Sequence, residues 1–172
     1  MSIFISIASY QDPLLASTIK SACMKASAEQ DLVFGVCDQS SSPIDASSLS
    51  NKAKIHYEHI DPILSKGPCW ARNRLQSFYQ GEDYFLQIDS HTQFDKNWDV
   101  ILLDQLRSLQ GLSSEPYFSK PIITAYPRSF EVISIKDEEF KLNSTDDLVY
   151  SIAYRRDSIF MKDLFSRQIG RP

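Results

Sequence analysis

The sequence lacks several features by which common classes of protein are recognised. Its three cysteines, Cys23, Cys37 and Cys69, are odd in number and far apart, so no CxxC pair indicates a structural metal or redox site. The cysteines are better explained as small buried hydrophobic residues in a reducing compartment. The formal net charge is −4, and a non-specific nucleic-acid binder needs a positive surface, so we expect no nucleic-acid partner. A local basic pocket for a small anion remains compatible with this charge.

Long apolar runs are also lacking. No stretch approaches the roughly 20 apolar residues that span a bilayer, and the N-terminus lacks the basic start and long apolar run of a signal peptide. We therefore expect a cytoplasmic protein with no membrane partner. The chain has 172 residues, 42% of them hydrophobic and 23% charged. This composition is typical of a soluble protein, and we expect a single domain over residues 1–172.

Apolar and amphipathic segments alternate along the chain. Short apolar, β-branched runs predict strands in its first half at 3–9, 31–38, 53–60 and 83–88. Helical spacing predicts helices after Asp12-Pro13, at about 68–80 and at 97–110. Further strands are expected at 120–127, 130–135 and 149–155, and a short helix at 157–165. Alternation of this kind predicts an α/β fold, in which helices cover both faces of a mostly parallel sheet.

The expected helices carry more specific predictions. Asp12 suits the N-cap of the first helix, and Pro13 suits its first turn. Arg72 is expected in the first turn of the helix after Gly67-Pro68, where free N–H groups attract an anion. Arg74 points elsewhere and is expected to be solvated. In the helix at 97–110, Asp99 is expected as a helix-start charge, and the side facing the core as Trp98, Ile101, Leu102, Leu106 and Leu109.

A carboxylate and an imidazole follow the apolar strand at 83–88. Asp89 and His91 are two residues apart, so in extended backbone they lie on one side, about 6.5 Å apart at Cα. Both side chains could then bind one divalent cation, and an Asp-His pair suits manganese better than magnesium, which remains the alternative. In an isolated Asp-x-His, Asp89 more often only caps a turn. His56 and His59 lie three apart in a strand, on opposite faces, and are expected to be ordinary strand residues.

Five blocks of sequence occur in a characteristic order: "IFISIASYQDP", "FGVCDQS", "KGPCWARNR", "YFLQIDSHTQFDKNWD" and "ITAYP". Together, over residues 3 to about 130, they resemble the cytoplasmic N-acetylglucosaminyltransferases with a GT-A fold. Named members of that family transfer N-acetylglucosamine from UDP-N-acetylglucosamine to a hydroxyproline of a ubiquitin-ligase subunit. The Asp-x-His motif is similar to that of the polypeptide N-acetylgalactosaminyltransferases.

The resemblance implies a donor site built from residues that follow the strands. Tyr10, Gln11 and Asp12 would contact uracil and ribose, and Asp38 a ribose hydroxyl or the base. Asp12 as a helix cap and Asp38 as a turn residue remain alternatives. The donor-binding residues expected on this basis are Ser9, Tyr10, Gln11, Asp12, Asp38, Gln39, Lys66, Arg72, Asp89 and Ser90, with Asp89 and His91 as metal ligands.

The function implied is metal-dependent transfer of a sugar, N-acetylglucosamine by resemblance, from a UDP-sugar to a hydroxyl on a protein or glycan. Such enzymes usually continue well beyond the donor motifs, so the chain is expected to lack the acceptor part. The alternative is a non-catalytic module that binds a nucleotide sugar or a partner. A sugar-nucleotide pyrophosphorylase ranks last, because "SIASYQDP" is neither glycine-rich nor basic. No catalytic base is identified.

Overall fold

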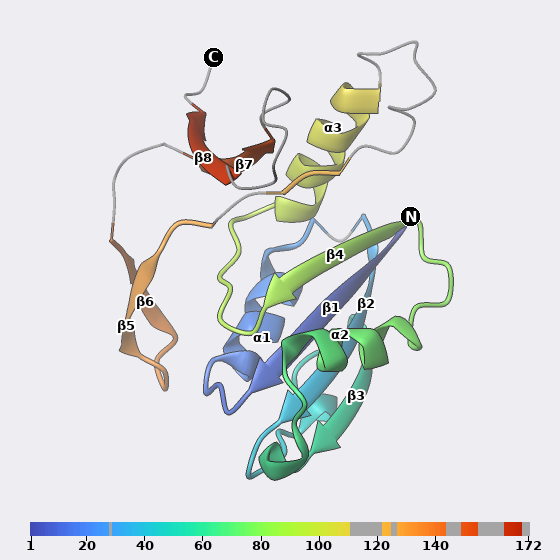
Figure 1. Ribbon diagram of the computed structural model, residues 1–172, viewed down its shortest axis with the longest axis vertical. Helices are drawn as coiled ribbons and strands as arrows, with labels where there is room; N and C mark the ends of the chain where they lie inside the picture. The colour runs from blue at the N-terminus through green and yellow to red at the C-terminus, as the bar shows by residue number, and fades with distance from the viewer. Residues whose placement is uncertain (28, 111–121, 125–126, 144–148, 155–163, 170–172) are drawn as a thin grey trace. The chain divides into compact units, whose positions relative to one another are not determined.

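The computed structural model describes residues 1–27, 29–110, 122–124, 127–143, 149–154 and 164–169 (Figure 1). The chain forms two compact units, Met1–Leu103 and Asp104–Pro172. The first unit contains every residue that the sequence nominates for a site.

The first unit is built on four parallel strands, each of them at a position that the sequence predicts. The strands are β1 (Ser2–Tyr10), β2 (Asp31–Gln39), β3 (Lys54–Ile60) and β4 (Tyr84–Asp89). They lie in the order β3-β2-β1-β4, and Ile7 in β1 is opposite Val36 in β2 and Ile88 in β4. The predicted α/β fold with a parallel sheet is therefore confirmed.

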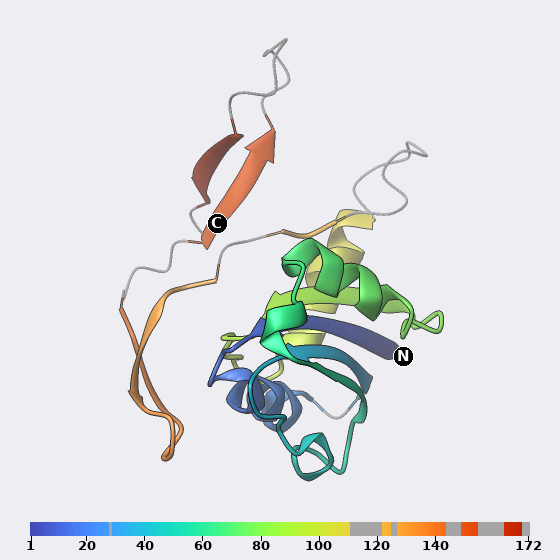
Figure 2. The same cartoon turned by 60° about the horizontal axis from the view of Figure 1, so that its bottom comes forward.

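Helices α1 (Leu15–Lys25) and α2 (Pro68–Gln76) cover opposite faces of this sheet (Figures 1 and 2). The reason is the path of the chain: the β1-α1-β2 connection and the β3-α2-β4 connection run in opposite directions across the sheet. Because crossovers between parallel strands are right-handed, a reversal of direction moves the connecting helix to the other face. The fold is thus the three-layer, Rossmann-like arrangement of a GT-A domain.

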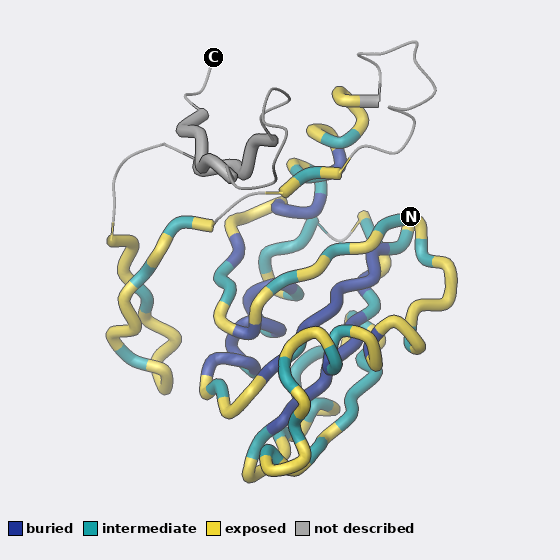
Figure 3. Tube along the Cα trace, in the orientation of Figure 1, coloured by how far each residue is buried: buried dark blue, intermediate teal, exposed yellow. Residues whose placement is uncertain are grey.

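Each face of the sheet has its own hydrophobic core, and the most deeply buried trace runs along β1 and β2 (Figure 3). On the α1 face, Ile5, Ile7 and Phe34 pack against Leu15 and Ile19. The α2 face has a smaller cluster of buried residues, Cys37, Ala71 and Leu75. Full burial of one such aliphatic or aromatic side chain stabilises a fold by roughly 1.5–3 kcal/mol.

Helix α3 (Trp98–Gln110) is rotated relative to the prediction. Its Asp99 is fully buried and accepts hydrogen bonds from Ser27 N (2.9 Å) and Ser27 Oγ (2.6 Å), so it is more than a helix-start charge. At about 100° per residue, a buried Asp99 turns Leu103 inward and Ile101 outward. Leu103 is accordingly buried, whereas Ile101 and Leu109, both predicted to face the core, are exposed.

Two helix ends also differ from the prediction. Helix α1 begins at Leu15, not at Pro13, because Asp12 Oδ1 accepts a hydrogen bond from Leu14 N (2.9 Å) and forms a turn before the helix. Helix α2 ends at Gln76 rather than near residue 80. From Ser77 to Tyr79, each N–H bonds to the carbonyl three residues earlier, which tightens the chain out of the α-helix.

The second unit contains two antiparallel pairs: β5 (Phe130–Ser134) with β6 (Glu139–Leu142), and β7 (Val149–Tyr154) with β8 (Leu164–Ile169). The strands predicted at 130–135 and 149–155 are confirmed. Within the strand predicted at 120–127, residues 122–124 and 127 are not extended in a sheet, and the rest lie outside the described residues. Of the helix predicted at 157–165, Leu164 and Phe165 belong to β8, and the rest lies outside. Among the described helices, none is long and apolar enough to cross a membrane.

Candidate functional site

The candidate site lies at the carboxyl edge of the sheet, where the strand order changes direction. From β1 the chain moves to β2 and β3 on one side and then returns to β4 on the other side of β1. In open parallel sheets, ligands bind in the crevice outside such a switch point. Register places Ala8 of β1 opposite Asp89, and Ser9 opposite Asp38, so the predicted residues do meet at one edge.

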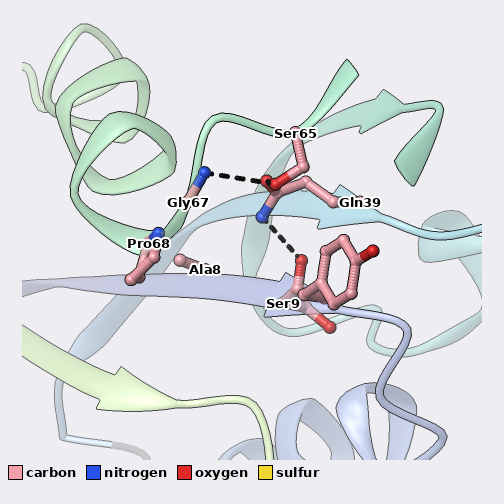
Figure 4. Close-up of a pocket in the computed structure, with 7 residues that line it drawn as sticks. Ala8, Ser9, Gln39, Ser65, Gly67 and Pro68 are labelled. Atoms are coloured by element: carbon pink, nitrogen blue, oxygen red, sulfur yellow. Dashed lines mark hydrogen bonds between the residues drawn. The ribbon is translucent and has the colours of Figure 1, made fainter. Parts of the chain in front are cut away.

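A pocket of about 390 Å³ opens at the ends of β1 and β2 (Figure 4). It is lined by Ala8, Ser9, Tyr10, Gln39, Ser65, Gly67 and Pro68. Three of these were nominated from the sequence. Ser65, Gly67 and Pro68, which precede and begin α2, were not nominated, although the positive φ of Gly67 (89°) is the kind of conformation that favours glycine at a helix start.

Gln39 braces the wall of this pocket. Its side chain is only 2% exposed, donates from Nε2 to Ser9 O (2.9 Å) and accepts at Oε1 from Ser65 Oγ (2.6 Å), as Figure 4 shows in part. Ser65 Oγ in turn accepts from Gly67 N (3.3 Å). The amide of Gln39 therefore ties the end of β1 to the segment that begins α2.

Tyr10 is the exposed aromatic side chain of the pocket, with 56% of its surface accessible. Gln11, the next residue, has a positive φ of 47°, donates from its N–H to Gln39 O (3.0 Å) and accepts at Oε1 from Ser41 Oγ (3.1 Å). Gln11 therefore supports the turn after β1. Side chains alternate along a strand, so Ser9 points to the face that carries Ile5 and Ile7.

Asp38 is buried beneath the loop that follows β2. Its Oδ2 accepts a hydrogen bond from Tyr57 Oη (2.6 Å), and Tyr57 Oη accepts from Ile44 N (3.1 Å). Burial raises the pKa of Tyr57, and the hydrogen bond to Asp38 raises it further. Tyr57 of β3 thus connects this loop to Asp38, and Asp38 is not among the residues that line the pocket.

Asp12 binds two residues of the turn that contains the Asp-x-His motif, on the β4 side of β1. Its Oδ2 accepts from Ser90 Oγ (2.7 Å) and contacts His91 Nδ1 (2.8 Å). Burial of Asp12 opposes ionisation, but the hydrogen bonds from Ser90, His91 and Leu14 outweigh it and lower the pKa of Asp12. Thr18, a residue that sequence reasoning missed, holds the same turn: Oγ1 donates to Ser90 O (2.7 Å) and accepts from Thr92 N (3.0 Å).

Asp89 is held by α2. Arg72 Nη2 donates to Asp89 Oδ1 at 3.2 Å, and the Asp89 side chain remains 66% exposed. Arg72 is the fifth residue of α2, so it lies in the second turn and not in the predicted first turn. Its Nε atom is buried without a hydrogen-bond partner among the described residues. One donor of the Arg72 guanidinium is therefore unpaired within the described residues.

The other cations near α2 have partners of their own. Arg74, expected to be solvated, forms an ion pair with Glu58, in which its Nε donates to Oε2 at 2.9 Å. Lys66 is exposed, with Nζ 6.0 Å from the centre of the Trp70 ring. The two strand histidines contact residues outside the candidate site. His56 stacks on Phe78, and His59 Nε2 contacts Ser40 O (2.7 Å).

Ser90 and His91 lie in a turn and not in the extended backbone that the sequence predicts, but a carboxylate and an imidazole still suit a divalent cation as a partial ligand set. An ionised carboxylate can only accept hydrogen bonds, so a neutral His91 beside Asp12 would carry its proton on Nδ1 and offer the Nε2 lone pair to a ligand. Both side chains are well exposed, at 66% and 60%. Over the described part of the chain, no group of three or more His, Cys, Asp or Glu side chains could hold a metal. Water and a bound phosphate would have to complete the shell.

The pocket and its exposed aromatic ring, at the carboxyl edge of an open parallel sheet, define an α/β protein with a ligand-sized site. Comparison with protein families is consistent with this class. The family model described as Glycosyltransferase (GlcNAc) matches residues 2–53 and 43–155. The chain therefore belongs to this glycosyltransferase family. None of the curated proteins matches the chain.

Proposed function

We propose that the protein transfers N-acetylglucosamine from UDP-N-acetylglucosamine to a hydroxyl of a protein or glycan, with a divalent metal, manganese in preference to magnesium. The observation that carries this proposal is the exposure and hydrogen bonding of Asp89 and His91 in the Asp-x-His turn. Asp89 is exposed opposite Ala8, a residue of the pocket, and His91 keeps Nε2 free. The metal motif and the pocket are thus separated by a single strand.

The pocket suits the nucleoside of such a donor. The exposed ring of Tyr10 offers a flat face on which a base can stack, and base–aromatic stacking contributes about 1–3 kcal/mol in other proteins. Gln39 and Ser65 also line the pocket, where their side chains bond to each other. A nucleoside that stacks on Tyr10 would direct its diphosphate across β1, toward Asp89 and Arg72.

The difficult part of the reaction is departure of UDP, which leaves negative charge on the diphosphate. A metal bound by Asp89 and His91 would supply Lewis-acid stabilisation of that charge. Arg72 adds directed hydrogen bonds from a planar guanidinium, which bridges two phosphate oxygens better than an ammonium group does. The chain's own part is to hold these groups near their working positions before the reaction starts, so that little reorganisation remains.

Titration calorimetry of UDP with and without manganese tests the metal site. We expect manganese to strengthen UDP binding, and Asp89→Ala or His91→Ala to weaken it by about 10–100-fold, as loss of one charge-assisted contact of about 1.5–3 kcal/mol predicts. His59→Ala, which removes an exposed histidine bonded to Ser40, is the matched control. Equal UDP affinity with and without manganese contradicts the proposal.

Release of UDP from UDP-N-acetylglucosamine tests transfer itself. With manganese and a panel of hydroxyproline peptides, serine peptides and glycans, we expect one acceptor class to stimulate release. Tight, manganese-dependent donor binding with no release on any acceptor would overturn the transferase proposal and support a non-catalytic module that binds the nucleotide sugar.

A further inference from the structure

We propose that Asp12 is the positioning residue of the metal site: it fixes the orientation and tautomer of His91 and does not contact the nucleotide. This inference rests on the proposed function, because it assigns a role toward the metal that Asp89 and His91 would bind. It differs from the role that family resemblance implies for Asp12, which is contact with uracil or ribose.

The hydrogen bonds of Asp12 leave little of its carboxylate for a ligand. Oδ1 accepts from Leu14 N (2.9 Å), and Oδ2 accepts from Ser90 Oγ (2.7 Å) and lies 2.8 Å from His91 Nδ1. The side chain is only 15% exposed. Both oxygens are therefore engaged inside the protein, one by the start of α1 and the other by the Asp-x-His turn.

The imidazole of His91 depends on this contact. The ring is 60% exposed, so packing alone does not restrict its rotation. Thr18 fixes the backbone of the turn through Ser90 O and Thr92 N, but it does not touch the ring. Asp12 holds the ring at Nδ1, which directs Nε2 away from the carboxylate. Metal-binding histidines commonly donate their second N–H to a carboxylate in this way, and loss of that partner typically costs 10–100-fold in metal affinity.

A purely structural role for Asp12 is the competing explanation, since its Oδ1 closes a turn before α1. The Asp12→Asn variant distinguishes this structural role from the positioning role toward His91. Asparagine is as good as aspartate in such turns, so Oδ1 can still accept from Leu14 N. Its NH₂ group then faces His91 and donates to Nδ1. The imidazole must accept there and carry its proton on Nε2, so that this proton has to move before Nε2 can bind a metal.

The experiment has two readouts, the tautomer of His91 in the metal-free protein and its affinity for manganese. Long-range ¹H–¹⁵N spectra report the tautomer, and a His91→Gln variant assigns the signal among the three histidines. In the wild type we expect the proton on Nδ1. In Asp12→Asn we expect it on Nε2, with manganese affinity in the presence of UDP reduced about 10–100-fold.

Asp45→Asn is the matched control, because Asp45 Oδ1 closes a similar turn on Ser47 N (3.2 Å) outside the site. It should change neither readout. Thermal unfolding of all variants should agree within a few degrees. An Asp12→Asn protein that keeps the wild-type tautomer and manganese affinity overturns the inference while the proposed function stands.

The wild-type protein alone also decides the matter if Asp12→Asn does not fold. A proton on Nε2 of wild-type His91 overturns the inference, whatever the variant does. Failure of wild-type UDP binding to respond to manganese overturns the proposed function, and the positioning role toward a metal is then overturned with it.

Discussion

Replacement of Gln39 by methionine tests whether the donor pocket has a wall held by a single buried amide. Methionine keeps most of the length and volume of glutamine, so the change removes two hydrogen bonds with little change in packing. These are the bond from Gln39 Nε2 to Ser9 O and the bond from Ser65 Oγ to Gln39 Oε1. Gln39 is 2% exposed, so water has poor access to the groups left behind.

The expected cost follows from these two bonds. A hydrogen bond contributes about 0.5–1.5 kcal/mol net, and a buried partner left unsatisfied costs about 1–3 kcal/mol. Loss of the donor to Ser9 O therefore dominates, and we expect Gln39→Met to lower the free energy of unfolding by about 2–4 kcal/mol. Ser65→Ala removes the second bond and also the longer bond from Gly67 N (3.3 Å), at a half-buried position, and we expect about 1–2 kcal/mol.

Urea unfolding measures both single variants and the double variant, and UDP titration measures the pocket. The two changes delete one shared bond, so their costs should not add, with a coupling of about 1 kcal/mol. UDP affinity should fall about fivefold in Gln39→Met, because the segment that contains Ser65 and Gly67 must be ordered on binding at about 1 kcal/mol. Stability of Gln39→Met within 0.5 kcal/mol of wild type, about the error of such comparisons, would refute this account of the wall.

Two further predictions concern the sheet and its surface. Gly35→Ala would place a Cβ atom 2.5 Å from Phe4 Cζ. It should therefore lower the free energy of unfolding, measured by urea unfolding, by about 1–3 kcal/mol. The cost should be smaller in a Phe4→Leu background. The hydrogen bond from Arg74 lowers the pKa of Glu58 below its ordinary value of 4.5, so the pair stabilises the fold above that pH and loses its effect as the pH falls through the lowered pKa. Between pH 7 and 3, wild type should therefore lose about 0.2–1 kcal/mol more than Glu58→Gln does, and equal losses would contradict this.

The positions of the strands could be predicted because each is a local apolar run. The residues that follow the strands could also be nominated, because the ends of parallel strands meet at one edge. The four strands of the first unit appear where the apolar runs predict them, and Asp12, Asp38 and Asp89 each follow or end a strand. Family resemblance added the type of ligand, and the family itself is shown by the match to the Glycosyltransferase (GlcNAc) model.

The contacts of these residues could not be predicted, because their partners lie far away along the chain. Asp12 was expected to cap the helix that follows it, but its Oδ2 is engaged by Ser90 and His91, 78 and 79 residues later. Asp99 was expected to be a helix-start charge, and its bond to Ser27 rotates α3. The carboxylates of Asp12 and Asp99 both look like local charges at a helix start in the sequence. In the fold, each forms hydrogen bonds with residues that are distant in the sequence.

The Asp-x-His turn is held from both faces of the sheet, and this arrangement sets the cost of cation binding under the proposed function. Helix α1 holds Ser90 and His91 through Thr18 and Asp12, and these bonds leave His91 Nε2 free. On the other face, Arg72 of α2 bonds to Asp89 Oδ1. A cation that binds here would find the imidazole of His91 already oriented. The carboxylate of Asp89, in contrast, would have to share or release its hydrogen bond with Arg72. An exposed ion pair such as Arg72–Asp89 contributes about 0.2–1 kcal/mol. A directed contact between the metal and the carboxylate, at about 1.5–3 kcal/mol, would therefore outweigh it. The freed guanidinium would then be available to the diphosphate of the donor.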